Sequence, residues 1–198
     1  ITQIIAFNLD TNQVAIFNTT KMITNLLIIF LSSYSIPFLA DLNRRNSIEL
    51  KNDMLSILEF YHYSIFIILF TGTLIIYFFG DQIYVYWLSN IDIQFDHKLL
   101  KLLLIAGAIQ VFNLSNSNIL ISTNKHIKLS LINFIISILY IFLSIYLIKK
   151  FSLIGVVYSM IFLEIINLLI INIIILNEMS YLKARFFKSM IIFLILMT

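Results

Sequence analysis

Two charged residues lie inside long apolar stretches of this chain, where charge is rare. Lys21 follows a run of apolar and small polar residues, and Glu164 lies near the middle of the stretch Leu153–Leu176. An ionised side chain at the centre of a bilayer costs about 2.5–3.5 kcal/mol on insertion scales, so it usually has a role there. Lys21 is therefore a candidate to attract an anionic substrate. Glu164 is a candidate contact for an ion, a proton or a substrate.

Each of these residues also has a structural interpretation. Lys21 lies two turns into its expected helix, so its long side chain is able to extend to the outer interface of the membrane. Glu164 is able to stay neutral and form a hydrogen bond with an Asn side chain of another helix. The sequence leaves both alternatives open.

Polar residues recur at helical spacing around these charges. Asn18, Lys21 and Asn25 are three and four residues apart, which stacks them on one side of a helix. Similar stripes occur in later stretches, and the candidates for a substrate path are Lys21, Asn18, Asn25, Gln110, Asn113, Asn133 and Glu164. Because polar groups are costly against lipid, we expect these faces to point into a bundle or a water-filled cavity. Helix packing is the alternative role for any single Ser, Thr or Asn.

The stretches that carry these residues are long enough to cross a bilayer. A hydrocarbon core about 30 Å thick needs ~20 apolar residues of helix, and a helix satisfies its own backbone polar groups. The stretches of this length are Val14–Ala40, Leu58–Phe79, Leu99–Ser122, Leu129–Ile148 and Leu153–Leu176. We predict an all-α integral membrane protein, a multi-helix transmembrane bundle with about five complete spans and partial ones at each end.

The composition supports a membrane protein. Hydrophobic residues make up 61% and charged residues 12% of the chain, against about 45–50% and about 25% in soluble domains. With one Pro and four Gly, no flexible linker is evident, so we predict a single transmembrane domain over residues 1–198. Ile1–Phe7 and Phe186–Thr198 resemble parts of further spans. We therefore expect a fragment, the C-terminal part of a larger transporter.

Several kinds of chemistry are unsupported by the residues present. The chain has no Cys, which excludes disulfides and thiol catalysis. The histidines lie near or outside the ends of the expected spans and do not form a metal-ligand set; they are His62, His97 and His126. No phosphate-binding Gly-rich loop or signature of a catalytic motif occurs. We expect no catalytic residue, metal or cofactor, and no nucleic-acid partner.

The distribution of Lys and Arg predicts how the spans are oriented. Cytoplasmic connections of membrane proteins carry an excess of these residues. Eight of them lie in three alternate segments, which are Asp41–Ile57, Thr123–Lys128 and Asn177–Lys188. The intervening connections carry four, including the pair Lys149 and Lys150, which opposes the bias. We expect the three segments in the cytoplasm and Gly80–His97 outside, where its Tyr and Trp residues resemble an interfacial aromatic belt.

Short motifs in a fixed order resemble a known family. They are Val14–Lys21, Ile36–Ala40, Tyr86–Leu88, Ile119–Lys128 and Phe151–Val157. Together they resemble the C-terminal half of polysaccharide flippases, which carry O-antigen or capsule repeat units, in the MATE-like multidrug/oligosaccharidyl-lipid/polysaccharide exporter superfamily. Asn124 stands where that family usually has Gly, and Ser152 stands where Gly is common.

The resemblance implies one lobe of a two-lobed helical bundle, multi-pass in the cytoplasmic (inner) membrane. It implies a transporter and not an enzyme, which flips an undecaprenyl-pyrophosphate-linked oligosaccharide by alternating access for surface polysaccharide biosynthesis. The implied partners are this lipid-linked oligosaccharide, membrane lipids and other polysaccharide-assembly proteins. Lys21 would then contact the pyrophosphate, while the polar stripes would contact sugar hydroxyls.

Three other functions compete with this expectation. A cation-coupled multidrug exporter of the same superfamily is favoured by an acid in the cavity, and Glu164 is such a candidate. An integral-membrane polysaccharide polymerase or glycosyltransferase would be expected to have a long outer loop with catalytic acids or arginines. Gly80–His97 is short and has no Arg, so we rank the enzyme lower. A purely structural membrane subunit is the remaining alternative.

Overall fold

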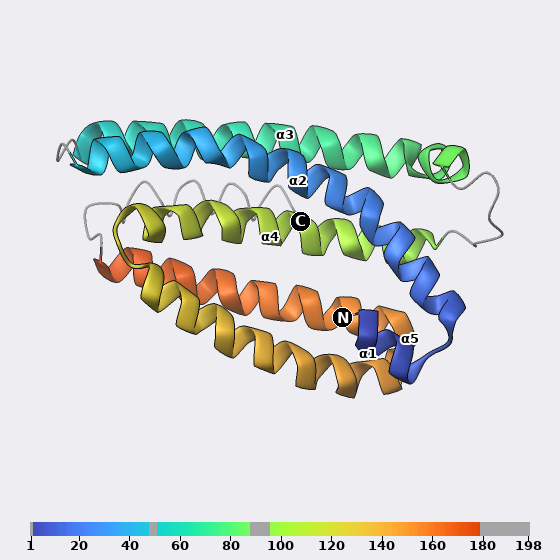
Figure 1. Ribbon diagram of the computed structural model, residues 1–198. Helices are drawn as coiled ribbons and strands as arrows, with labels where there is room; N and C mark the ends of the chain where they lie inside the picture. Colours follow the sequence, from blue (N-terminus) through green and yellow to red (C-terminus); the bar gives the residue numbers. More distant parts are fainter. Residues whose placement is uncertain (1, 48–50, 88–95, 179–198) are drawn as a thin grey trace.

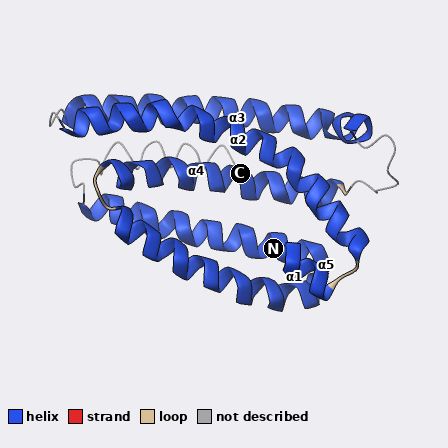
Figure 2. Ribbon diagram, in the orientation of Figure 1, coloured by secondary structure: helices blue, strands red, loops and turns tan. Residues whose placement is uncertain are grey.

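The described part of the chain is helical throughout its regular structure. The computed structural model describes residues 2–47, 51–87 and 96–178, and Figure 2 shows helices joined by short turns in these ranges. The helices are α1 (Thr2–Asn8), α2 (Thr11–Ser47), α3 (Lys51–Trp87), α4 (His97–Ser122) and α5 (His126–Glu178). Within the described ranges, four of them, α2 to α5, are long and apolar enough to cross a membrane. The all-α prediction is confirmed.

Helix α4 is the centre of the bundle. In Figure 1, α2 and α3 lie side by side, and α4 runs between them and α5. Most residues of α4 are buried, including its small residues Ala106, Gly107 and Ala108. A Cβ on Gly107 would lie 3.1 Å from Cδ1 of Ile28, so α2 approaches α4 closely at this point. This close approach positions the polar faces of the two helices.

The outer surface of the bundle is apolar, as a bilayer requires. Large hydrophobic side chains are exposed along the first half of α5, where Phe134 is 63% and Phe142 is 69% exposed. The outer side of α3 is similar, with Ile67 and Phe78 exposed. Exposing so large an apolar surface to water would cost free energy, whereas lipid tails would solvate it.

Helix α5 bends back on itself at Ser152. This residue has φ 55° and ψ −139°, a non-helical conformation between two helical segments. The two segments run side by side (Figure 1). The hydroxyls of Ser144 and Ser159 lie 2.7 Å apart across them. The predicted stretches Leu129–Ile148 and Leu153–Leu176 therefore lie in separate helical segments of α5, on either side of Ser152.

Gly155 lies where the two segments of α5 come closest. A Cβ at this position would lie 2.2 Å from the carbonyl oxygen of Leu147, a backbone atom held by its own helix. We expect Gly155→Ala to destabilise the purified protein by about 1–3 kcal/mol, measured as a lower temperature of thermal unfolding in detergent. Gly72→Ala is the matched control, because the nearest atom there is the flexible end of Leu27. An equal loss in both variants would contradict this packing.

The helices extend further than the apolar stretches. Asp41–Ile57, expected as a loop, is helical up to Ser47 and again from Lys51. Gly80–His97 is likewise helical up to Trp87, and its residues 88–95 lie outside the described residues. Helix α2 has 37 residues, which at 1.5 Å per residue is about 55 Å. Its polar end therefore continues as helix beyond the thickness of the hydrocarbon core.

The connections expected in the cytoplasm lie at one end of the bundle. Figure 1 shows that α2 ends, α3 begins and α4 joins α5 at the same end, where the described part of α5 also ends. The bend at Ser152 and the α1–α2 connection lie at the opposite end. The sequence interval Asn177–Lys188 is described only up to Glu178, and its lysines and arginine lie outside the described residues, as does Phe186–Thr198.

The turn between α4 and α5 explains Asn124. Its φ of 59° is in the left-handed region, which Asn tolerates better than most residues. The amide N–H of Lys125 donates to the Leu120 carbonyl at 2.8 Å, and that of Asn124 donates to Ile121 at 3.0 Å. This is the Schellman arrangement, in which a Gly or Asn closes the end of a helix.

Candidate functional site

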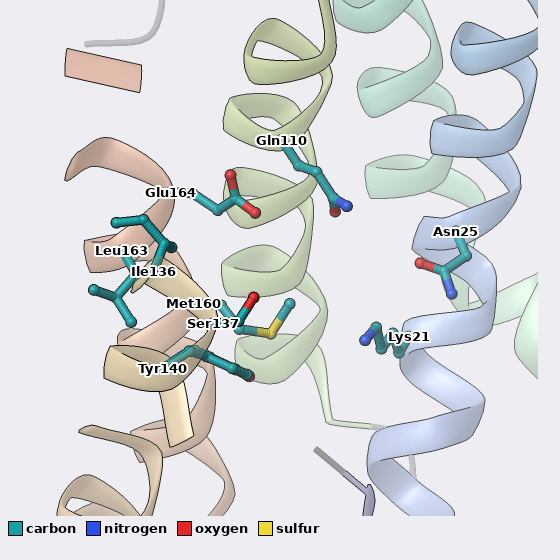
Figure 3. A pocket seen from close by; sticks show the side chains of 9 residues that line it. All are labelled: Lys21, Asn25, Gln110, Ile136, Ser137, Tyr140, Met160, Leu163 and Glu164. Atoms are coloured by element: carbon teal, nitrogen blue, oxygen red, sulfur yellow. The ribbon is translucent and has the colours of Figure 1, made fainter. Parts of the chain in front are cut away.

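A polar cavity lies between α2, α4 and both segments of α5. Its volume is about 410 Å³, within the range of about 300–1,000 Å³ for small-molecule sites. The residues that line it are Lys21, Asn25, Gln110, Ile136, Ser137, Tyr140, Met160, Leu163 and Glu164 (Figure 3). Four of the seven predicted path residues therefore line one cavity, and they come from three helices far apart in the sequence.

Lys21 presents a positive charge to this cavity. The residue is half-buried on α2, and Figure 3 shows its ammonium nitrogen directed into the cavity. The nitrogen lies 5.7 Å from the centre of the Phe17 ring, a cation–π contact one turn away. No carboxylate of the described residues forms an ion pair with it. The charge is therefore available to an anionic ligand.

Amide groups extend the polar wall beside this charge. Asn25 follows Lys21 by one helical turn on α2, and Gln110 reaches into the same space from α4 (Figure 3). An amide side chain offers both a donor and an acceptor, which is the pairing that sugar hydroxyls need. The cavity therefore combines one cation with groups suited to neutral polar ligands.

Glu164 faces neighbouring helices, as we expect for an acid at that depth. Asn113 of α4 donates a hydrogen bond from Nδ2 to the Glu164 carboxyl oxygen Oε2. The same Nδ2 also donates to the backbone carbonyl of Glu164 at 2.9 Å. Asn113 is only 4% exposed, whereas Glu164 is half-buried. Glu164 therefore bonds to an Asn of another helix, as its structural interpretation expects. It also lines the cavity, as its functional interpretation requires.

Two predicted path residues lie away from the cavity. Asn18 is exposed, and its side-chain oxygen Oδ1 accepts a hydrogen bond from the hydroxyl of Thr2 in α1 at 3.1 Å. Asn133 is also exposed, and its Oδ1 accepts a 3.4 Å bond from Asn167 within α5. Asn113 reaches the cavity only through Glu164.

The structure contains a buried chain of polar contacts across three helices, and the predicted path residues do not include it. Nε2 of His62 in α3 lies 3.2 Å from Oδ1 of Asn116, whose Nδ2 donates to Oδ1 of Asn172 in α5 at 2.8 Å. His62 is 7% exposed and lies in α3, six residues after the start of the apolar span Ser56–Trp87. The three residues come from separate stretches of the sequence, so the spacing of residues within one stretch does not predict these contacts. They tie α3, α4 and α5 together at one level.

The other two histidines begin helices. His97 is the first residue of α4 and pairs with Asp81 near the end of α3 at 3.2 Å. His126 is the first residue of α5. Neither lines the cavity.

Comparison with known proteins assigns no relationship. No family model, curated protein or solved structure matches this chain. Function is therefore inferred from the cavity and from the motifs described above.

Proposed function

We propose that this protein is a flippase that moves an undecaprenyl-pyrophosphate-linked oligosaccharide across the inner membrane for surface polysaccharide biosynthesis. The observation that carries the proposal is an ammonium group without an ion-pair partner among the described residues, set with amides in a cavity between membrane-spanning helices. A phosphate would find the charge of Lys21 there, and sugar hydroxyls would find Asn25 and Gln110. The polyprenyl tail of the substrate would stay in the bilayer, in contact with the apolar outer surface of the bundle.

Backbone conformation supports the membership in the MATE-like exporter superfamily that we propose. The two non-Gly residues with positive φ in the described ranges are Asn124 and Ser152. These are the positions where the resemblance places Gly, the residue that adopts such conformations without strain. The same turns fit a lobe in which the two segments of α5 are separate spans, giving five crossings.

Translocation in vesicles tests the proposal directly. Purified protein is reconstituted with undecaprenyl-pyrophosphate-linked sugar that carries a fluorophore, and an impermeant reductant is added outside. We expect label in the inner leaflet to become accessible only in vesicles that contain the protein. A labelled polyprenyl lipid without pyrophosphate and sugar is the control. Loss of inner label no faster than in protein-free vesicles would contradict a flippase.

The orientation gives a separate prediction. We expect Asn124 to face the cytoplasm and Asn12 to face outward, because Lys and Arg gather at the Asn124 end of the bundle. The chain has no Cys, so Asn124→Cys and Asn12→Cys each give a single labelling site. An impermeant maleimide added to intact cells should label the variant at position 12 and not the one at 124. The reverse pattern would invert the topology.

A cation-coupled multidrug exporter is the second candidate, and Glu164 favours it. Its carboxyl lines the cavity between helices, as a site for a coupling ion or a cationic drug would require. An exporter would move cationic dyes across vesicles in response to a sodium or proton gradient, without moving lipid-linked sugar. The same vesicles therefore distinguish the two candidates.

A further inference from the structure

The cavity has an ammonium group on one wall and a carboxyl group on the opposite wall. Figure 3 shows the Lys21 side chain entering from α2 and the Glu164 carboxyl entering from α5, with Gln110 of α4 beside the space between them. The two charged groups do not form an ion pair with each other. A site built only for a pyrophosphate would not need the acid, because a carboxylate facing the ligand repels an anion.

The Glu164 carboxyl keeps capacity for a further hydrogen bond. Asn113 donates to Oε2 from the protein side of the cavity wall. No described residue bonds the other oxygen, Oε1. A carboxyl group has about four acceptor positions over its two oxygens. Asn113 therefore fixes the orientation of the group and leaves Oε1 able to accept from a ligand.

The groups between the two charges suit a sugar ring. Ser137, on the first segment of α5, adds a hydroxyl to the amides of Asn25 and Gln110, while Tyr140 lines the cavity with its ring and keeps its hydroxyl buried. Leu163 and Met160 supply apolar surface beside them. A ligand that spans the cavity therefore meets a cation at one side, a hydroxyl and amides along its length, and a carboxyl at the other.

We propose, building on the flippase function, that this cavity recognises a phosphorylated amino sugar. Lys21 binds the anionic phosphate, and Glu164 accepts hydrogen bonds from the ammonium group of the sugar. A sugar without a free amine leaves Oε1 facing the ligand without a charged donor, and that unmatched polar group lowers affinity. The acid thereby selects among glycan heads that all carry the phosphate.

Matched soluble probes test this proposal. Glucosamine 6-phosphate and N-acetylglucosamine 6-phosphate carry the phosphate and the amine on opposite sides of the ring. They differ only in a free or an acetylated amine, and each is titrated calorimetrically into the purified protein in detergent. We expect the free amine to bind about tenfold more tightly or better, the effect of one charged hydrogen bond. In Glu164→Gln the difference should fall to within about twofold, since Gln keeps an oxygen for Asn113. Lys21→Ala should weaken both probes, and Asn133→Ala, outside the cavity, should change neither.

The outcomes separate this proposal from the flippase function. Equal binding of the two probes, or a preference that survives Glu164→Gln, overturns amine recognition and leaves phosphate binding by Lys21 intact. Unchanged binding of both probes in Lys21→Ala overturns the anion site on which the flippase proposal depends. No binding of either probe at millimolar concentration overturns both.

Discussion

Replacing Lys21 with Ala should lower the rate of lipid-linked oligosaccharide translocation by about 10- to 100-fold, the effect of losing a charged hydrogen bond of about 1.5–3 kcal/mol. The residue supplies a cation to the cavity without an ion-pair partner among the described residues, so its loss removes the attraction for phosphate without freeing a buried acid. Lys21→Arg should retain more activity, because the charge survives although its geometry changes.

The measurement is the initial rate of inner-leaflet label loss in vesicles matched for protein content. Lys21→Met is the sensitive control, since it keeps the length of the side chain and removes only the charge. We expect it to behave like Lys21→Ala. If Lys21→Met transports at the normal rate, the charge has no role in the path, and Lys21 serves as a membrane anchor that extends to the interface.

Replacing Asn113 with Ala should destabilise the protein by about 1–3 kcal/mol, because the half-buried Glu164 carboxyl loses its hydrogen-bond donor. Asn113 is 4% exposed and bonds both the carboxyl and the backbone carbonyl of Glu164, so the loss affects two acceptors. Glu164→Gln should have a much smaller effect on stability, because the amide oxygen still accepts from Asn113. This pair of variants separates the packing role of the contact from the charge of the acid.

Thermal unfolding in detergent measures both variants under the same conditions. A clear drop in unfolding temperature for Asn113→Ala together with a near-normal Glu164→Gln fits the observed contact. Full stability of Asn113→Ala would mean that the two helices do not depend on this bond. If Glu164→Gln also transports lipid-linked oligosaccharide at the normal rate, the charge of the acid is not used in that reaction.

Hydrophobicity alone predicts the helices but not their ends. Each apolar stretch lies within a helical segment, since the cost of unsatisfied backbone groups in lipid leaves few alternatives. The ends were misplaced because polar residues such as those of Asp41–Ser47 also form helix, outside the hydrocarbon core. The bend at Ser152 has only a weak sequence signal, the adjacent lysines and a Ser in place of Gly.

Spacing within a helix predicts part of the cavity. Lys21 and Asn25 lie one turn apart and both line it, whereas Asn18 bonds to α1 instead. That outcome depends on where the short helix α1 packs, which the stripe does not encode. The pairing of Glu164 with Asn113 and the His62 chain join helices distant in sequence. Such partners depend on the relative rotation of packed helices, which a periodic pattern in one stretch leaves undetermined.

Photo-crosslinking of a lipid-linked oligosaccharide tests most directly whether the cavity is the substrate path. A photoreactive amino acid replaces Gln110, which lines the cavity, or Asn133, an exposed amide residue outside it. The two positions match in residue class, and both lie in helices long and apolar enough to cross a membrane. The flippase proposal predicts a crosslink to the labelled substrate at position 110 that excess unlabelled substrate removes, and only background at position 133. Equal crosslinking at both positions, or labelling at 133 alone, would contradict the cavity as the path of transport.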